Sequence, residues 1–207
     1  MRYHEFREAF KLYTVFSVND IRKVESRFYV RRLVEWQDRG YIKKIIRGYY
    51  VFADLKLDEN VLFEIANRIY NPSYISFEMA LSCYQMIPES VYGLTSASSR
   101  KTMIFKTNVG DFIYHTIRPR LLFGYKLVDY NGRRFKIADP EKALLDYFYI
   151  NTTIKSENDF AGMRIAREQY LTQVDERRLM AYLNEFRQKR LAKRVKSFME
   201  YVKDAQY

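Results

Sequence analysis

Hydrophobic positions in residues 17–54 follow two different periods, one after the other. Before Gly40 the apolar residues recur every three or four positions, which predicts helices, and after it they form short β-type runs. Ser17 is suited to cap a first helix that begins near residues 18–20 and ends near residues 24–25. A second helix is expected over residues 26–38 or 26–39, and Gly40 supplies the left-handed residue that ends it.

The second of these helices is predicted to be amphipathic. Its apolar side chains share one arc of the helical wheel, and most of its charged side chains share the opposite arc. It should therefore have a buried stripe and a cationic face. The buried stripe is expected to contain Tyr29, Val30, Leu33 and Trp36, and the opposite arc contains Arg27, Arg31 and Asp38, with Arg32 on the flank.

After Gly40, strands are expected over residues 41–46 and 49–53, joined by a tight turn at Arg47-Gly48. Two helices followed by a basic ribbon indicate a winged helix-turn-helix, in which the second helix enters the major groove and the ribbon reaches phosphates. Exposed cations are also common as plain solvated charge, and winged helices also serve as protein-interaction modules. The candidate DNA-binding residues here are Arg22, Lys23, Ser26, Arg27, Arg31, Arg32, Lys43, Lys44 and Arg47.

The rest of the pattern predicts an α+β chain of two domains. Residues 1–56 form the expected winged helix-turn-helix, and residues 57–207 form a mixed α/β domain with antiparallel hairpins and C-terminal helices. Helices are expected over residues 3–13, 59–70, 77–84, 140–150, 164–170, 176–186 and 188–203. Strands are expected over Val91 to Thr95, then over residues 101–107, 112–117, 125–130 and 133–137.

The last predicted helix is also amphipathic. Its inner face should contain Leu191, Val195, Phe198 and Val202. Its outer face contains a second group of cations, for which solvated charge and contact with DNA or another polyanion are both open interpretations. This group is Arg190, Lys193, Arg194 and Lys196.

Charge and cysteine content narrow the classes of function. The 207 residues have a formal net charge of +11, which favours a polyanionic partner such as nucleic acid. Cys83 is the only cysteine, so neither an internal disulfide nor a multi-cysteine metal site can form, and a packed thiol is expected. No apolar run reaches the length of about 20 residues that a membrane span needs. We therefore expect a cytoplasmic protein with no cofactor and no membrane contact.

Two stretches carry alternative chemistry. Asp139-Pro140-Glu141-Lys142 is typical of a helix start, with Asp139 as the N-cap and Glu141 at the positive end of the helix dipole. The alternative is a metal-dependent nuclease or nucleotide-processing enzyme with Asp139 and Glu141 as metal ligands. Ser96 to Lys101 offers hydroxyls and cations for a phosphate, but it lacks the glycine spacing of a phosphate loop and is expected to be a polar connector.

Several short motifs follow one another from about Val15 to the C-terminal helices. They are Arg39-Gly40-Tyr41-Ile42, Arg47-Gly48-Tyr49-Tyr50, Ile65-Ala66-Asn67, Pro72-Ser73-Tyr74-Ile75-Ser76, Ala80-Leu81, Ile87-Pro88-Glu89, Phe123-Gly124-Tyr125 and Ile137-Ala138-Asp139-Pro140-Glu141-Lys142-Ala143-Leu144-Leu145-Asp146. Taken in this order, the motifs resemble those of the AbiEi family of antitoxins.

The resemblance implies a transcriptional autorepressor and antitoxin of a type IV toxin–antitoxin, or abortive-infection, pair. Its N-terminal winged helix would bind inverted repeats of double-stranded DNA in its own promoter, as a monomer or as a cooperative pair. Its C-terminal domain would counter a cognate nucleotidyltransferase-like toxin, with or without direct contact. The chain lacks the Gly-Ser and spaced aspartates that nucleotidyltransferase chemistry requires, so it resembles the antitoxin and is not expected to be an enzyme.

Overall fold

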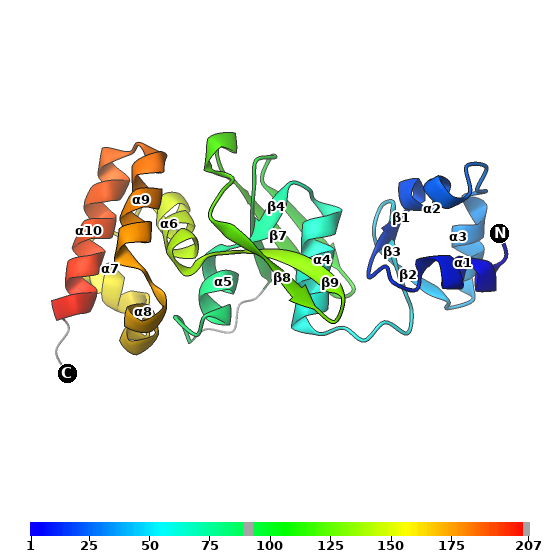
Figure 1. The fold of residues 1–207 in the computed structure, drawn as a ribbon, viewed down its shortest axis with the longest axis horizontal. Helices are drawn as coiled ribbons and strands as arrows, with labels where there is room; N and C mark the ends of the chain where they lie inside the picture. The colour runs from blue at the N-terminus through cyan, green and yellow to red at the C-terminus, as the bar shows by residue number, and fades with distance from the viewer. Residues whose placement is uncertain (89–92, 205–207) are drawn as a thin grey trace.

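The computed structural model describes residues 1–88 and 93–204, and in this part of the chain the fold is α+β with two sheets. A three-stranded sheet has the order β1-β3-β2, and a six-stranded sheet has the order β6-β7-β5-β4-β9-β8. Figure 1 shows the N-terminal elements, the six-stranded sheet and the C-terminal helices following one another along the long axis. No helix in these two ranges combines the length and apolar character needed to cross a membrane.

The N-terminal unit, residues 1–54, is built on one aromatic-rich core. It contains α1 (Tyr3–Phe10), β1 (Phe16–Ser17), α2 (Val18–Val24), α3 (Arg31–Asp38), β2 (Ile42–Ile46) and β3 (Tyr49–Phe52). Ser17 caps α2, because its hydroxyl accepts the Asp20 backbone N–H at 3.2 Å. The core that holds these elements together consists of Phe6, Phe10, Phe16, Ile21, Phe28, Leu33, Trp36, Ile42, Tyr50 and Phe52.

The β2–β3 ribbon, residues 42–52, is antiparallel and connects two cores. β3 pairs with both β1 and β2, and the register of β2 with β3 shifts between Lys44 and Ile46. Ile42 and Ile45 are three residues apart, so strand alternation directs them to opposite faces of the ribbon, and Ile45 lies outside the N-terminal core. Its side chain is 6% exposed and belongs to the larger core of residues 57–204, together with Val15 and Val51. The ribbon is therefore packed against the rest of the molecule rather than standing free.

The central region places a mixed sheet against two helices. Its elements are α4 (Glu59–Ile69), β4 (Ser73–Ile75), α5 (Phe77–Cys83), β5 (Leu94–Ser98), β6 (Met103–Thr107), β7 (Gly110–Thr116), the 3-10 turn η1 (Pro119–Leu121), β8 (Tyr125–Tyr130) and β9 (Arg133–Ala138). Asp58 caps α4 by accepting the Val61 N–H at 2.8 Å. Neighbouring strands are antiparallel except for the parallel pairs β4 with β9 and β5 with β7.

The C-terminal helices pack on one another around aromatic side chains. They are α6 (Pro140–Ile150), α7 (Glu157–Gly162), α8 (Arg167–Gln173), α9 (Glu176–Phe186) and α10 (Lys189–Asp204). Phe148 of α6 lies 5.1 Å, between ring centroids, from Phe198 of α10, and Phe160 of α7 lies 5.6 Å from the same ring. These rings close the helical end of the molecule and leave the outer face of α10 to solvent.

A buried ion pair joins α6 to the sheet. Lys142 and Asp146 are both fully buried and form an ion pair one helical turn apart. The Lys142 ammonium donates to the Tyr74 hydroxyl at 2.7 Å, while Tyr74 and Ser76 each donate to Asp146 at 2.8 Å. Burial lowers the pKa of Lys142 and raises the pKa of Tyr74 well above its usual range. The four side chains thus satisfy one another's polar atoms inside the core.

Most predicted elements are present, and the differences have local causes. The helix predicted over 26–39 begins only at Arg31, because residues 25–28 form a turn that brings Phe28 into the core. The helix predicted over 164–170 lies at Arg167–Gln173, and the one predicted over 3–13 ends at Phe10. The strands β1 and β4 and the helix α7 were missed. The strand predicted over Val91 to Thr95 falls partly on residues 89–92, outside the described residues.

Replacing Lys142 by Met should destabilise the protein by about 3–5 kcal/mol, because the change leaves the Asp146 carboxylate buried without its cation. Urea unfolding at pH 7 measures the loss. The double variant Lys142→Met with Asp146→Leu should recover most of it, since both charges are then absent. The matched control is Lys196→Met on the exposed face of α10, expected to change stability by no more than about 0.5 kcal/mol. A single-variant loss as small as the control's would contradict this account of the core.

Candidate nucleic-acid interface

The outward face of α3 is the first part of the candidate interface. Leu33 and Trp36 anchor the helix to the N-terminal core, with exposed fractions of 1% and 5%. Their burial turns Arg31, Val34 and two acidic residues, Glu35 and Asp38, toward solvent. In the described residues the Arg31 guanidinium has no hydrogen bond or ion pair. The helix therefore presents an unpaired guanidinium next to an exposed apolar side chain.

The predicted burial of Tyr29 and Val30 is wrong. Tyr29 is 65% exposed and Val30 is 39% exposed, since both precede the first turn of α3 and Phe28 takes the buried position instead. The exposed surface before α3 is consequently more apolar than predicted, and it adjoins the exposed residues Ser26 and Arg27.

The cations of α2 and its following turn are accessible. Arg22, Lys23 and Arg27 are exposed, and neither Arg22 nor Arg27 has a side-chain hydrogen bond or ion pair in the described chain. Lys23 Nζ lies 3.7 Å from the Asp20 carboxylate, a long contact at an exposed ammonium. These side chains remain available to a phosphate backbone.

Arg32, unlike Arg31, has a hydrogen-bond partner within the protein. Its side chain is half-buried, and its guanidinium donates to the backbone carbonyl of Met1. The Met1 amino group in turn pairs with Glu25 at 3.0 Å. Its position on the flank of α3 directs Arg32 toward the start of α1, so its guanidinium is used within the protein. The Arg31 guanidinium has no such partner in the described residues and is the stronger candidate for a contact with DNA.

The cations of the β2–β3 ribbon lie on its solvent side. Lys43, Lys44 and Arg47 are exposed, and within the described ranges none has a side-chain hydrogen bond or ion pair. Ile45 between them is buried against the central region. Packing thus fixes the ribbon without using its charges.

The candidate cations of α10 are not brought together with those of α3. Arg190, Lys193 and Lys196 are exposed as predicted, but α10 and α3 lie at opposite ends of the molecule (Figure 1). Arg194 is not on the outer face. Its guanidinium donates to the Phe148 carbonyl at 2.8 Å and the Asn151 carbonyl at 2.9 Å, so it closes the C-terminal end of α6.

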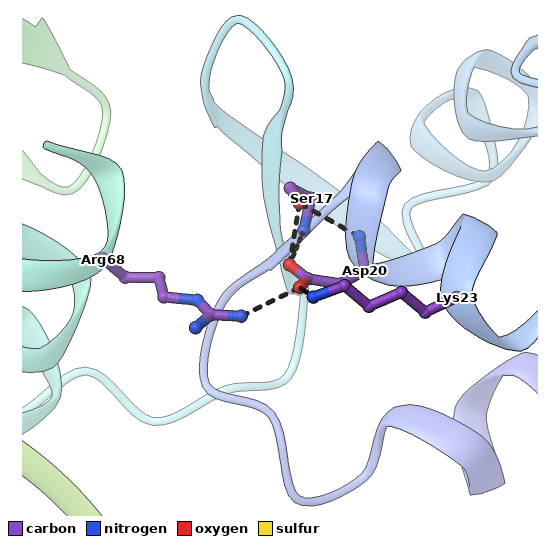
Figure 2. A network of polar contacts seen from close by, with 4 residues as sticks. All are labelled: Ser17, Asp20, Lys23 and Arg68. Atoms are coloured by element: carbon purple, nitrogen blue, oxygen red, sulfur yellow. Dashed lines mark hydrogen bonds and ion pairs between the residues drawn. The ribbon is translucent and has the colours of Figure 1, made fainter. Parts of the chain in front are cut away.

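A carboxylate of α2 connects the candidate interface to the central region, as Figure 2 shows. Asp20 accepts hydrogen bonds from the Ser17 N–H at 2.9 Å and hydroxyl at 2.7 Å, and from Arg68 of α4 at 3.0 Å. Burial opposes ionisation of Asp20, but the hydrogen bonds from Ser17 and the charge of Arg68 lower the pKa of Asp20 overall. Close by, the Thr14 hydroxyl donates to Glu64 of α4. The Ser17 cap was predicted but the role of Asp20 was not, although Ser17 and Asp20 have the Ser-x-x-Asp spacing of a capping box.

Asp139 and Glu141, the metal ligands of the alternative enzyme interpretation, contact other parts of the protein. The Asp139 side chain makes no capping bond to α6 and instead accepts from the Tyr182 hydroxyl at 3.0 Å. Glu141 is fully buried and accepts the Asp175 N–H at 2.7 Å. Nowhere in the described chain do three or more His, Cys, Asp or Glu side chains gather as a metal site. Asp139 and Glu141 thus each have a hydrogen-bond partner within the protein.

Two further expectations concern the thiol and the serine-rich stretch. Cys83 is half-buried, and burial raises its pKa to about 12, so the thiol stays protonated and acts as a packed side chain. Ser96 and Ser98 are buried within β5, whereas Ser99 to Lys101 lie in the connection from β5 to β6, as predicted. The Arg100 guanidinium stacks on Tyr70 at 4.1 Å. The first half of the stretch therefore forms part of the sheet, and the second half is the polar connector.

Neither a family model nor a curated protein matches this chain.

The Arg68–Asp20 contact should make stability sensitive to acid. Asp20 has a lowered pKa in the folded protein, so its contribution is present above the unfolded pKa of about 3.9 and is lost as pH falls through the folded value. The free energy of unfolding, measured by urea titration from about pH 5 to 2, should fall less steeply in Asp20→Asn than in the parent protein. Equal slopes would remove Asp20 from the acid response.

Replacing Arg68 by Ala should cost about 1 kcal/mol at pH 7, because a charge-assisted hydrogen bond to a largely buried carboxylate is lost. Arg134→Ala is the matched control. Arg134 pairs with Asp129, both side chains are 66% exposed, and such a surface pair contributes close to nothing. Urea unfolding of the two variants at pH 7 makes the comparison, and equal effects would show that the Asp20 contact adds no stability.

Proposed function

We propose that this protein is a sequence-specific DNA-binding transcriptional regulator, with residues 1–56 forming a winged helix-turn-helix domain and residues 57–207 a second α/β domain. The order α1-β1-α2-α3-β2-β3, with β3 between β1 and β2, supports the first assignment. In this arrangement α3 is the recognition helix and the β2–β3 ribbon is the wing.

The observation that carries the proposal is the pairing state of Arg31 on α3. Its helix is fixed to the core by Leu33 and Trp36, yet its guanidinium is exposed and, within the described residues, unpaired. Guanidinium groups on a rigid helix are suited to the paired acceptors of guanine in the major groove. Arg27 and Arg31 are the proposed base contacts. The proposed phosphate contacts are Arg22, Lys23, Lys43, Lys44 and Arg47.

We further propose that the regulator represses its own operon and acts as the antitoxin of a type IV toxin–antitoxin pair. This part rests on the resemblance of its motifs to the AbiEi antitoxins. The cognate toxin would be a nucleotidyltransferase-like enzyme, countered by the second domain. Co-purification of the two proteins at moderate salt distinguishes direct contact from indirect antagonism.

The decisive experiment is fluorescence anisotropy of the purified protein on DNA from upstream of its own gene. The expected result is tighter binding to that DNA than to random duplex of equal length, with affinity falling steeply as salt rises, because bound cations release counterions. Equal affinity for both DNAs would overturn the proposal of sequence-specific regulation.

Arg31→Ala should reduce discrimination between the upstream DNA and random duplex by about tenfold or more, since a bidentate arginine–guanine contact contributes ~1–3 kcal/mol. Lys43→Ala should weaken binding to both DNAs about equally. It should also reduce the steepness of log affinity against log salt concentration by about 1. Lys193→Ala on α10 is the control and should change neither quantity. Anisotropy titrations of the three variants on both DNAs at several salt concentrations provide the test, and a loss of discrimination in Lys193→Ala instead would reassign the recognition surface.

Val34 is 54% exposed on the same face of α3 and is suited to contact a thymine methyl group. Replacing thymine by deoxyuridine throughout the upstream DNA should weaken binding by about fourfold, the value of one buried methyl-sized group at ~0.8 kcal/mol. Val34→Ala should bind the thymine and the deoxyuridine forms of the upstream DNA with nearly equal affinity. If Val34→Ala discriminates between them as strongly as the parent protein, Val34 makes no such contact.

A further inference from the structure

A pocket of about 690 Å³ lies at the helical end of the molecule, away from the proposed DNA interface. The segment that follows α6 forms one wall, and the first half of α10, with the residue before it, forms the other. The lining residues are Thr152, Lys155, Gln188, Arg190, Leu191, Lys193, Arg194 and Ser197.

The charge of this pocket is one-sided. Lys155, Arg190, Lys193 and Arg194 contribute cations, and the described residues that line it include no carboxylate. The pocket of about 580 Å³ between the N-terminal unit and the central region differs, because Asp20 and Glu64 line it beside its cations. Unlike that pocket, the pocket near α10 has no carboxylate among the described residues of its wall.

Three of the four cations are available to a ligand. The side chains of Lys155, Arg190 and Lys193 are exposed and have no hydrogen bond or ion pair in the described parts of the chain. The nearby carboxylate of Asp159 accepts hydrogen bonds from the Ser156 hydroxyl at 2.6 Å and the Lys155 N–H at 3.0 Å in the capping box of α7, and its charge also attracts the Lys155 ammonium. It belongs to the helix start and does not line the pocket.

Arg194 supplies a fixed positive charge in the same wall. Three backbone carbonyls, those of Phe148, Asn151 and Ile154, hold its guanidinium in place. Carbonyl groups are neutral, so they orient the cation without cancelling its charge. Burial lowers the pKa of Arg194, which reflects a cation taken partly out of water without a carboxylate partner. An anion in the pocket would relieve that cost.

We infer that this pocket binds a compact phosphorylated anion through the converging cations Lys155, Arg190 and Lys193 and the fixed guanidinium of Arg194. The hydroxyls of Thr152 and Ser197 provide further hydrogen-bond donors in the wall. A recess of this size receives a compact phosphate chain, whereas the base edges of a duplex are read by an element that enters its groove. The described lining includes no aromatic ring on which a base could stack, so recognition is of the phosphates alone.

The test is isothermal titration calorimetry of the full chain with sodium tripolyphosphate at constant ionic strength. The expected result is saturable binding to one site. Lys155→Ala and Lys193→Ala should each weaken it by about tenfold, through the loss of one charge-assisted hydrogen bond. Lys196→Ala is the matched control, because Lys196 is an exposed cation of α10 outside the pocket and its removal should change affinity by less than about twofold. Thermal unfolding confirms that the variants are folded.

Further arms of the titration identify what is recognised. If the protein recognises the phosphates alone, the affinity for ATP should lie within about threefold of that for tripolyphosphate, and adenosine should not bind. Much tighter binding of ATP than of tripolyphosphate would overturn recognition of phosphate alone. Equal binding of sulfate, or an equal loss in Lys196→Ala, would reduce the site to general charge attraction.

Competition with nucleic acid separates this inference from the proposed function. Single-stranded or duplex DNA that binds here while tripolyphosphate does not would replace the inference with a nucleic-acid surface. Because α3 and α10 lie at opposite ends of the molecule (Figure 1), Lys193→Ala is expected to keep its affinity for the upstream DNA. Loss of one activity therefore leaves the other measurable.

Discussion

The buried ion pair between Lys142 and Asp146 sets the position of α6, the element that joins the sheet to the C-terminal helices. A fully buried ammonium is tolerated only where its charge and all its donors are satisfied, so Tyr74 of β4 and the α6 carboxylate must come together in one geometry. The rings of Phe123 and Phe186 lie 5.3 Å and 5.1 Å from the same nitrogen. The constraint extends to the backbone at Gly124. A Cβ there would lie 3.1 Å from the Lys142 side chain and 2.9 Å from Tyr182.

A second set of contacts connects the central region to the N-terminal unit. Ile45 of the ribbon and Val15 before β1 enter the large core, and Arg68 of α4 reaches the Asp20 carboxylate. Apolar packing contributes most of the stabilisation between the two parts, whereas the directional contact to Asp20 fixes the orientation of α2. The orientation of α3 follows, because α2 and α3 share one aromatic core. The central region therefore positions the proposed recognition helix, and the N-terminal unit does not present it alone.

Short-range sequence signals predicted much of the fold. The errors fall in segments whose structure depends on residues far away in the sequence. The caps at Ser17 and Asp58 and the turn at Asn131-Gly132 depend on neighbours within three residues, and each was predicted correctly. The three-residue strand β4 was missed because its identity comes from pairing with β5 and β9, far along the sequence. Arg32 and Arg194 looked like solvent-facing cations. Their backbone carbonyl partners, 31 and at least 40 residues away, cannot be read from a helical wheel.

For the candidate sites too, the net charge does not show how distant residues are brought together. A formal charge of +11 predicts attraction to polyanions, and one DNA-binding surface was the simplest interpretation. The structure divides the candidate cations between two distant places with different shapes (Figure 1). Around α3 they are exposed on the helix, the turn before it and the ribbon, whereas beside α10 Arg190, Lys193 and Arg194 line a recess. Charge alone attracts an anion, but the shape around the charge selects which anion fits, and for this reason we propose a different ligand for each cluster.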